Sequence, residues 1–270
     1  MSDLGTRVSV VIPCHNYGRF FGEALASVDA QDRRPDEIIV CDDGSTDGSW
    51  ETVQALVAGR DDIVAYHHPQ AWGLIRTFNE LVARSSGEII AGLSADDRFG
   101  PTFLRRMEED LVGRGLDFGY SDFRCFGAED WFFDAPEMDA DRLVRSNFIT
   151  GSAAFRRTLF DAVGGYSPAF ERLGFEDYDF WLSAVEQGFQ GGKVHGCVLE
   201  WRRHPGGSRN TATLGDRVRL RWMLLRHHPR FYLHPRTLRV LRGGRAAPSA
   251  IGSGSTGPTG AGTQEAEAPR

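Results

Sequence analysis

The stretch VCDDGSTDGSW (residues 40–50) decides the fold of this chain. An apolar run ends on two adjacent carboxylates, and a glycine and several small polar residues follow it. Short apolar runs with β-branched residues predict buried strands, and the polar residues that follow are typical of a turn and a helix start. The stretch therefore predicts a strand that passes through a tight turn into a helix. In open α/β sheets, ligands bind beyond the carboxyl ends of the strands, which is where this turn would lie.

The same alternation extends through the first hundred or so residues. Apolar runs predict four strands, at residues 8–13, 36–43, 62–68 and 87–97. Helical spacing of apolar residues predicts four helices, at residues 20–29, 48–59, 74–87 and 101–115. Because strands and helices alternate, we expect an α/β fold with a mostly parallel sheet and helices on both faces.

Composition indicates an ordinary soluble globular protein. The 270 residues are 41% hydrophobic and 25% charged, which suits a sizeable core. We find neither an apolar stretch of roughly 20 residues nor a signal-peptide layout at the start. The scattered cysteines suggest reduced thiols rather than a disulfide or zinc framework, so we expect a cytoplasmic protein. These cysteines are Cys14, Cys41, Cys125 and Cys197.

Charge is distributed unevenly along the chain. From Asp216 onward there are ten arginines and three acids, so this part carries about +7 and the rest about −13 of the net −6. We expect a catalytic domain at 1–215, a basic helical extension at 216–245 and a disordered low-complexity tail at 246–270. The favoured interpretation of the extension is a packed helix with a solvated basic face. The second interpretation is that the extension associates with the cytoplasmic face of a membrane. The extension contains no recognised nucleic-acid-binding motif, so we expect no nucleic-acid partner.

Two acidic pairs stand at the ends of predicted strands. Asp42–Asp43 and Asp96–Asp97 both fall at the carboxyl edge of the predicted sheet, so both can face one crevice. The glycine-rich fingerprints of dinucleotide and P-loop sites are missing. The sequence therefore favours a divalent cation held by carboxylates, with a diphosphate bound through the ion.

At this point a family resemblance is plain. The segment VSVVIPCHNYGRFFGEALASVDAQDRRPDEIIVCDDGSTDGSWE resembles the opening of a family 2 glycosyltransferase with the GT-A fold, and the likeness continues to about residue 210. Later segments that carry it are SSGEIIAGLSADDRFGP, GSAAFRRTLFDAVGGY, GFEDYDFWLSAVEQG and RRHPGGSRN. The resemblance implies inverting transfer of a sugar from a nucleotide-sugar donor to an acceptor hydroxyl, usually with Mn²⁺ or Mg²⁺.

The resemblance also suggests donor-binding residues. Asp43 matches the residue that accepts an N–H from the nucleobase, which favours UDP, dTDP or GDP over CDP because cytosine has no N3 hydrogen. Pro13 and His15 would border the base or ribose, or would simply be a strand stop and a turn histidine. Arg76 would reach the diphosphate, or would be a solvent-exposed helix residue.

The metal site resembles the family pattern with one departure. Ser94 stands where most relatives have the first aspartate of the motif. Asp96 matches the last aspartate, so it is the first choice as metal ligand and donor contact, and Asp97 is the second. His204 resembles a histidine that approaches the metal from a mobile segment, which Gly206 and Gly207 would allow to close.

Asp177 resembles the catalytic base of the family, although an acid in the first turn of a helix also complements the helix dipole. The acceptor is left open among a saccharide, a lipid-linked carrier and a small molecule. Trp131, Phe132 and Phe133 would either stack on an acceptor or fill the core. The alternative function is a catalytically silent nucleotide-sugar-binding or assembly protein on the same fold, an option that Ser94 keeps open.

Overall fold

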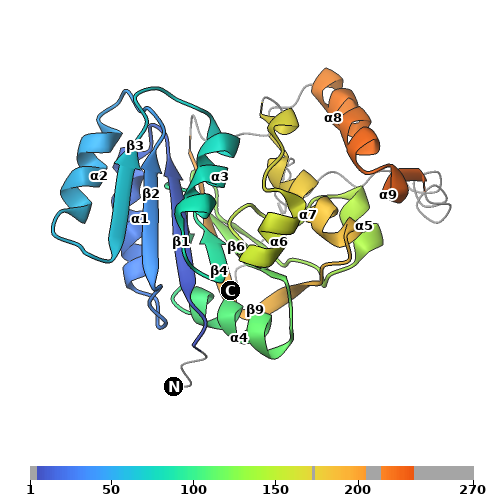
Figure 1. The fold of residues 1–270 in the computed structure, drawn as a ribbon, viewed down its shortest axis with the longest axis horizontal. Helices are drawn as coiled ribbons and strands as arrows, with labels where there is room; N and C mark the ends of the chain where they lie inside the picture. Colours follow the sequence, from blue (N-terminus) through green and yellow to red (C-terminus); the bar gives the residue numbers. More distant parts are fainter. Residues whose placement is uncertain (1–4, 172–173, 205–213, 234–270) are drawn as a thin grey trace, which may run out of the picture.

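Figure 1 shows a central sheet with helices on both sides, in a computed structural model that describes residues 5–171, 174–204 and 214–233. The sheet has nine strands in the order β3-β2-β1-β4-β8-β6-β9-β5, with β7 beside β6. The strands are β1 (Val8–Cys14), β2 (Glu37–Asp42), β3 (Ile63–His67), β4 (Ile89–Gly92), β5 (Arg98–Phe99), β6 (Phe118–Gly127), β7 (Trp131–Phe133), β8 (Ala154–Arg156) and β9 (Gly191–Arg203). The helices are α1 (Gly18–Asp29), α2 (Ser49–Val57), α3 (Leu74–Arg84), α4 (Phe103–Gly113), α5 (Ala140–Arg145), α6 (Arg157–Val163), α7 (Glu176–Glu186), α8 (Leu214–His227) and α9 (Pro229–Leu233), with a 3₁₀ turn η1 (Pro168–Phe170).

The amino-terminal part of the sheet confirms the predicted alternation. Strands β1 to β4 pair in parallel, and α1 to α4 lie at the predicted helical segments. In the register, Cys14 lies opposite Asp42, and Val11 lies opposite Gly92. The loops after β2 and β4 therefore leave the same sheet edge, one on each side of the end of β1.

The rest of the sheet is less parallel than the sequence predicted. Strand β8 runs antiparallel to both β4 and β6, and β7 and β5 add further antiparallel pairs. Strand β9 returns parallel to β6 over most of its length. For β7 the reason is local, because β6 and β7 are joined by a short connection that allows only antiparallel pairing. The α/β fold class holds, with a mixed sheet.

The core has two layers because strand residues alternate between the faces of the sheet. Val10 and Ile12 of β1 pack with α1, α2 and α4, whereas Val11 packs with α3, α6 and α7. The aromatic segment after β6 mainly fills the first layer: Trp131 and Phe133 pack on Phe123, at ring distances of 5.6 and 4.7 Å. Phe132 points outward and is 55% exposed.

The turn after β2 depends on Gly44. Asp42 Oδ1 accepts a hydrogen bond from the Ser45 amide at 3.1 Å, which closes the turn. Gly44 has φ +64, and a Cβ there would lie 2.3 Å from the backbone nitrogen of Ala71. Only glycine satisfies both the left-handed backbone and the close approach of the loop after β3.

The carboxy-terminal helices pack on the core layer that contains α7. The expected division between residues 215 and 216 falls inside α8, and the tail expected at 246–270 lies outside the described residues. Among the helices that the structure describes, none combines the length and hydropathy that a membrane span requires.

We predict that Gly44→Ala destabilises the protein more than Gly59→Ala does. Gly59 has φ +75, but a Cβ at this position would meet nothing within 4 Å, so Gly59→Ala isolates the backbone penalty of about 1–2 kcal/mol. Gly44→Ala adds the clash with Ala71, so its loss in the free energy of unfolding should exceed that of Gly59→Ala by at least about 1 kcal/mol. Equal urea midpoints for the two variants would contradict this role of Gly44 in the turn.

Candidate active site

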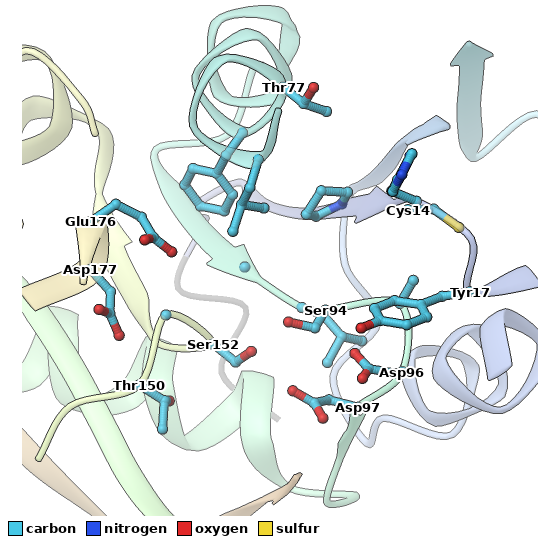
Figure 2. A pocket seen from close by; sticks show the side chains of 18 of the residues that line it. Cys14, Tyr17, Thr77, Ser94, Asp96, Asp97, Thr150, Ser152, Glu176 and Asp177 are labelled. Atoms are coloured by element: carbon cyan, nitrogen blue, oxygen red, sulfur yellow. The ribbon is translucent and has the colours of Figure 1, made fainter. Parts of the chain in front are cut away.

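A pocket of about 730 Å³ opens at the carboxyl edge of the parallel strands. This volume lies within the usual range for small-molecule sites. The pocket brings together six of the residues singled out from the sequence: Pro13, His15, Asp43, Asp96, Asp97 and Asp177. Figure 2 shows Asp96 and Asp97 on one side of it and Glu176 and Asp177 on the other.

Asp43 anchors one wall of the pocket. Its Oδ1 accepts the Trp72 amide at 2.8 Å, and its Oδ2 accepts the Gly73 amide at 2.9 Å. Burial alone would raise the pKa of Asp43, but the contact with His68 and these amide bonds outweigh it and hold the pKa below its usual value. The carboxylate is thus charged and fixes the loop between β3 and α3. A carboxylate oxygen has two lone pairs, so Oδ2 can accept a second hydrogen bond from a ligand.

His68 lies behind Asp43 and bridges two carboxylates. Its Nδ1 is 2.8 Å from Asp43 Oδ1, and its Nε2 is 2.7 Å from Glu80 Oε2. Cys41, His68 and Glu80 have their ligand atoms within 4.8 Å of one another, so they form a group that could hold a metal ion. The two histidine contacts are, however, hydrogen-bond distances, and burial raises the pKa of the Cys41 thiol to about 12. We interpret the group as a support for Asp43.

His15 and Arg76, two other residues predicted to bind the donor, differ in their position relative to the pocket. His15 lines the pocket, and its Nδ1 lies 2.7 Å from the Asp43 carbonyl, which fixes the ring at the end of β1 next to Pro13. Arg76 is different, since it is absent from the pocket lining. Its guanidinium lies 3.6 Å from the centre of the Trp72 ring. The structure therefore does not bring Arg76 to the site, because this stacking holds the side chain against Trp72 instead.

Asp96 contacts His204 at a second wall of the pocket. The Nε2 of His204 lies 3.1 Å from Asp96 Oδ2, and its ring packs on Phe20 at 4.7 Å. Arg202 holds the neighbouring backbone: its amide donates to Asp97 Oδ1 at 2.9 Å, and its Nε donates to the Asp96 carbonyl at 2.9 Å. Strand β9 thus brings His204 to Asp96 from about a hundred residues away. Gly206 and Gly207 lie outside the described residues.

Burial determines the electrostatics of this acidic pair. Asp96 is 8% and Asp97 4% exposed. Burial raises the pKa of Asp96, although the contact with His204 offsets part of the effect. Burial and repulsion by Asp96 raise the pKa of Asp97 well above its usual value. Two buried carboxyl groups side by side are unfavourable as anions, and a bound cation removes that penalty.

The third wall is the start of α7. Phe175 adopts φ +69, a left-handed conformation that is uncommon for an aromatic residue, directly before Glu176 and Asp177. Asp177 Oδ1 accepts the Tyr178 amide at 2.7 Å, and Oδ2 accepts the Asn147 side-chain amide at 3.3 Å. Each oxygen can accept a further hydrogen bond. In Figure 2 both carboxylates point into the pocket.

The environment of this wall favours a proton acceptor near neutral pH. Burial raises the pKa of Asp177 to about 6, against the opposing hydrogen bonds from Tyr178 and Asn147. Burial and the charge of Asp177 raise the pKa of Glu176 to about 7. A general base works best when its pKa lies close to the operating pH. Asp177 therefore has both the position in the pocket and the raised pKa that a general base would need.

Sequence reasoning missed three residues of the site. Asn147 orients Asp177, and Arg202 holds Asp96 and Asp97, but both reach the site from loops or strands distant in sequence. The third is Tyr166, whose ring stacks on Phe78 at 4.5 Å. Its buried hydroxyl lines the pocket without a hydrogen-bond partner among the described residues, so a ligand hydroxyl could satisfy it.

Comparison with known proteins now decides the family. The model of glycosyl transferase family 2 matches residues 9–168, which is more than half of the chain. The protein belongs to glycosyltransferase family 2. The putative glycosyltransferase EpsE of Bacillus subtilis (strain 168) is 26% identical over 73% of this chain and 73% of its own length. A β-1,3-glucosyltransferase of Escherichia coli, WfaP, named for UDP-Glc and α-D-GlcNAc-diphosphoundecaprenol, is 24% identical over 74% of this chain and 78% of its own.

Solved structures show that this glycosyltransferase has the GT-A fold. S. aureus TarS 1–349 in complex with UDP-GlcNAc has a TM-score of 0.66 and 17% identity, over 77% of this chain and 62% of that one. The mannosyltransferase PcManGT from Pyrobaculum calidifontis, in complex with GDP-Man and Mn²⁺, has a TM-score of 0.60 and 20% identity. That match covers 90% of this chain and 66% of that one.

We predict that Asp177→Asn stabilises the fold at neutral pH. The ordinary aspartate pKa is 3.8 and the folded value is about 6, so between them the folded state keeps a proton that the unfolded state has lost. The stability of the wild type therefore falls as the pH rises from about 4 to 6. The variant does not lose this stability, because its side chain at this position does not titrate. Its melting temperature should exceed that of the wild type at pH 7.5, and the difference should vanish near pH 4.

A control separates this effect from the helix dipole. Glu51 is an exposed acid in the first turn of α2, where loss of charge costs about 0.3–1 kcal/mol. Glu51→Gln should therefore lower the melting temperature slightly. An Asp177→Asn variant that melts below the wild type at pH 7.5 would show that Asp177 serves the helix dipole.

Proposed function

We propose that this glycosyltransferase inverts the anomeric centre as it moves a sugar from UDP, dTDP or GDP to an acceptor hydroxyl, with Asp177 as general base and Mn²⁺ or Mg²⁺ at Asp96. One observation carries the proposal. A single pocket is lined by Asp43 and Asp96 at the ends of the parallel strands and by Asp177 on the opposite wall. That arrangement suits a donor bound along the strand edge and an acceptor that approaches from α7.

The residues present fit a divalent cation. Asp96 supplies a carboxylate and His204 an imidazole, and the Nε2 of His204 lies 3.1 Å from Asp96 Oδ2. Asp97 adds a second buried carboxyl group beside them. Oxygen-rich sites of this kind suit Mg²⁺ and Mn²⁺. Asp96 and His204 would hold the ion, with Asp97 next to them. When bound, the ion stabilises the negative charge that develops on the leaving diphosphate.

Asp177 performs the proton transfer in this proposal. The acceptor oxygen forms a bond to the anomeric carbon while the bond from that carbon to the diphosphate breaks. The acceptor proton passes to Asp177, whose carboxylate Tyr178 and Asn147 keep oriented. A positioned base of this kind contributes about 100- to 10,000-fold to the rate.

The donor base meets the wall built on Asp43. Its Oδ2 can accept an N–H from uracil, thymine or guanine, whereas cytosine offers no N3 hydrogen. Pro13 and His15 border the same part of the pocket. For the acceptor we favour a lipid-linked saccharide met at the cytoplasmic face of a membrane. The support is the name of the E. coli relative, which specifies a diphosphoundecaprenol acceptor.

We predict that UDP, dTDP or GDP raises the melting temperature of the chain more with Mn²⁺ than with EDTA, and that CDP has the weakest effect. A ligand at 100 times its dissociation constant stabilises by about 2.7 kcal/mol. Asp96→Asn should remove the manganese dependence. The exposed, salt-bridged Asp62→Asn serves as control and should retain it. Nucleotide shifts that are equal with Mn²⁺ and EDTA would reject the metal site.

We predict that Asp177→Asn binds the donor normally but turns over about 100- to 10,000-fold more slowly. Turnover can be measured as release of nucleoside diphosphate from the nucleotide-sugar that the thermal screen selects, with water as acceptor. Wild-type kcat/KM should fall tenfold per pH unit below about 6, since Asp177 must be ionised. Near wild-type turnover by Asp177→Asn would end this assignment.

The second candidate function is nucleotide-sugar binding without transfer. Ser94 favours it, because this residue lines the pocket where most relatives place another carboxylate. In that case Asp96→Asn would weaken nucleotide binding, but no nucleotide-sugar would be cleaved at any pH. The turnover measurement above therefore separates the two functions.

A further inference from the structure

Helix α8 is held on the catalytic domain by its inner face. Leu220 and Leu224 are 9% and 3% exposed and join the core layer that contains α7. Just after the helix, His228 lies 3.0 Å from Asp179 and 2.9 Å from Glu186, both on α7. The helix is thus fixed relative to the helix that carries Asp177. Figure 1 shows α8 at the end of the molecule opposite α2.

The outer face of α8 carries an apolar stripe. Val218, Trp222 and Leu225 are 62%, 61% and 38% exposed. At 100° per residue they fall within about 60° of one another, on the side of the helix away from Leu220 and Leu224. Only a few large hydrophobic side chains in the described part of the chain are exposed, and this helix concentrates three of them in one line.

Arginines border this stripe on both sides. On the same helical geometry, Arg221 lies about 60° to one side of Val218, and Arg219 and Arg226 lie about 80–100° to the other. All three are exposed, and none forms a salt bridge with a carboxylate among the side chains that the structure describes, which begin at Val218 on this helix. The Arg226 guanidinium is 5.8 Å from the Trp222 ring centre. The face therefore combines exposed arginines with an aromatic and aliphatic centre.

We propose that α8 docks on the surface of an anionic phospholipid bilayer, with Trp222 and its apolar neighbours at the level of the headgroups. An interfacial helix has this layout: a hydrophobic stripe that enters the boundary and arginines that pair with lipid phosphates. The charge of the chain fits too, since residues 214–233 contain five arginines and one acid, about +4, whereas residues 1–213 carry about −13. An anionic surface would attract the α8 end and repel the remainder, which orients the protein.

Charge and area disfavour a second copy of the chain as occupant. Two α8 faces would place like-charged arginines against each other. Three side chains also cover far less than the roughly 800 Å² per partner of a stable interface. The stripe therefore suits a fluid apolar boundary better than a protein.

Docking through α8 has a consequence for the acceptor, which rests on the proposed function. Helix α8 packs on α7, and α7 begins at Glu176 and Asp177. The wall of the pocket that faces the acceptor thus belongs to the same side of the molecule as the docking helix. A lipid-linked acceptor in the bilayer would then meet the protein on the side that carries α7.

The test is flotation of the full chain with extruded vesicles, in the absence of any substrate. We expect binding to vesicles of phosphatidylcholine with about 30% phosphatidylglycerol at about 0.1 M NaCl, and at least tenfold weaker binding to pure phosphatidylcholine or at about 0.5 M NaCl. Two α8 variants should each lose at least tenfold in affinity for the anionic vesicles. They are Trp222→Ser and the triple variant Arg219→Gln, Arg221→Gln and Arg226→Gln.

Matched controls lie elsewhere on the surface. Phe132→Ser removes an aromatic side chain of similar exposure from β7, and a second triple variant removes three exposed arginines from other elements. These arginines are Arg34, Arg106 and Arg124, each changed to glutamine. Both controls should bind vesicles as the wild type does. Melting temperatures within about 2 °C of the wild type would show that the α8 variants are folded.

Three results would overturn the proposal. The wild type could fail to float with the anionic vesicles at low salt. The α8 variants could bind as tightly as the controls. Sedimentation equilibrium could instead show a dimer that Trp222→Ser abolishes, which would make a second copy the occupant. The nucleotide-induced thermal shift of the α8 variants should equal that of the wild type. Absence of the shift in the wild type and in all variants would count against the proposed function, not against docking.

Discussion

The parallel pairing of β1 with β2 on one side and with β4 on the other is the constraint on which the site depends. Because the three strands run in the same direction, the loops that follow β2 and β4 leave the sheet at one edge, beside the end of β1. This register brings the loops that carry Asp43 and Asp96 to the same edge of the sheet. The helices that return the chain cover both faces, and the pocket opens at that edge.

Buried carboxyl groups on the walls give the pocket its chemistry. Asp43 accepts hydrogen bonds from two backbone amides and contacts His68, and it stays charged. Asp96 and Asp177 are less well compensated, and burial raises the pKa of each. In the proposed function, the unfavourable anion at Asp96 would favour a bound cation, and the one at Asp177 would favour a proton from the acceptor. Burial of the two carboxyl groups would then lower the stability of the fold at the places where the reaction uses them.

Local patterns predicted the amino-terminal half of the fold because each strand there pairs with a neighbour through a regular βα unit. They did not predict β8 or the long β9, since those partners are chosen by contacts far apart in sequence. The site divides in the same way. The roles of Asp43, Asp96 and Asp177 were suggested by their motifs. Those of Asn147 and Arg202 depend on contacts with residues far away in sequence, which were not predicted even though Arg202 stands in the segment RRHPGGSRN. Arg76 was another candidate for donor binding, but its guanidinium stacks on Trp72 and the residue does not line the pocket.

The central claim is that one pocket holds the nucleotide and the metal together. A crystal of the chain soaked with MnCl₂ and the nucleoside diphosphate that the thermal screen selects tests it directly, through the anomalous signal of manganese. We expect one manganese peak in contact with Asp96 and His204, with the diphosphate on the ion and the base against the wall built on Asp43. A manganese peak at Cys41, His68 and Glu80, or a nucleotide bound outside the pocket, would contradict it.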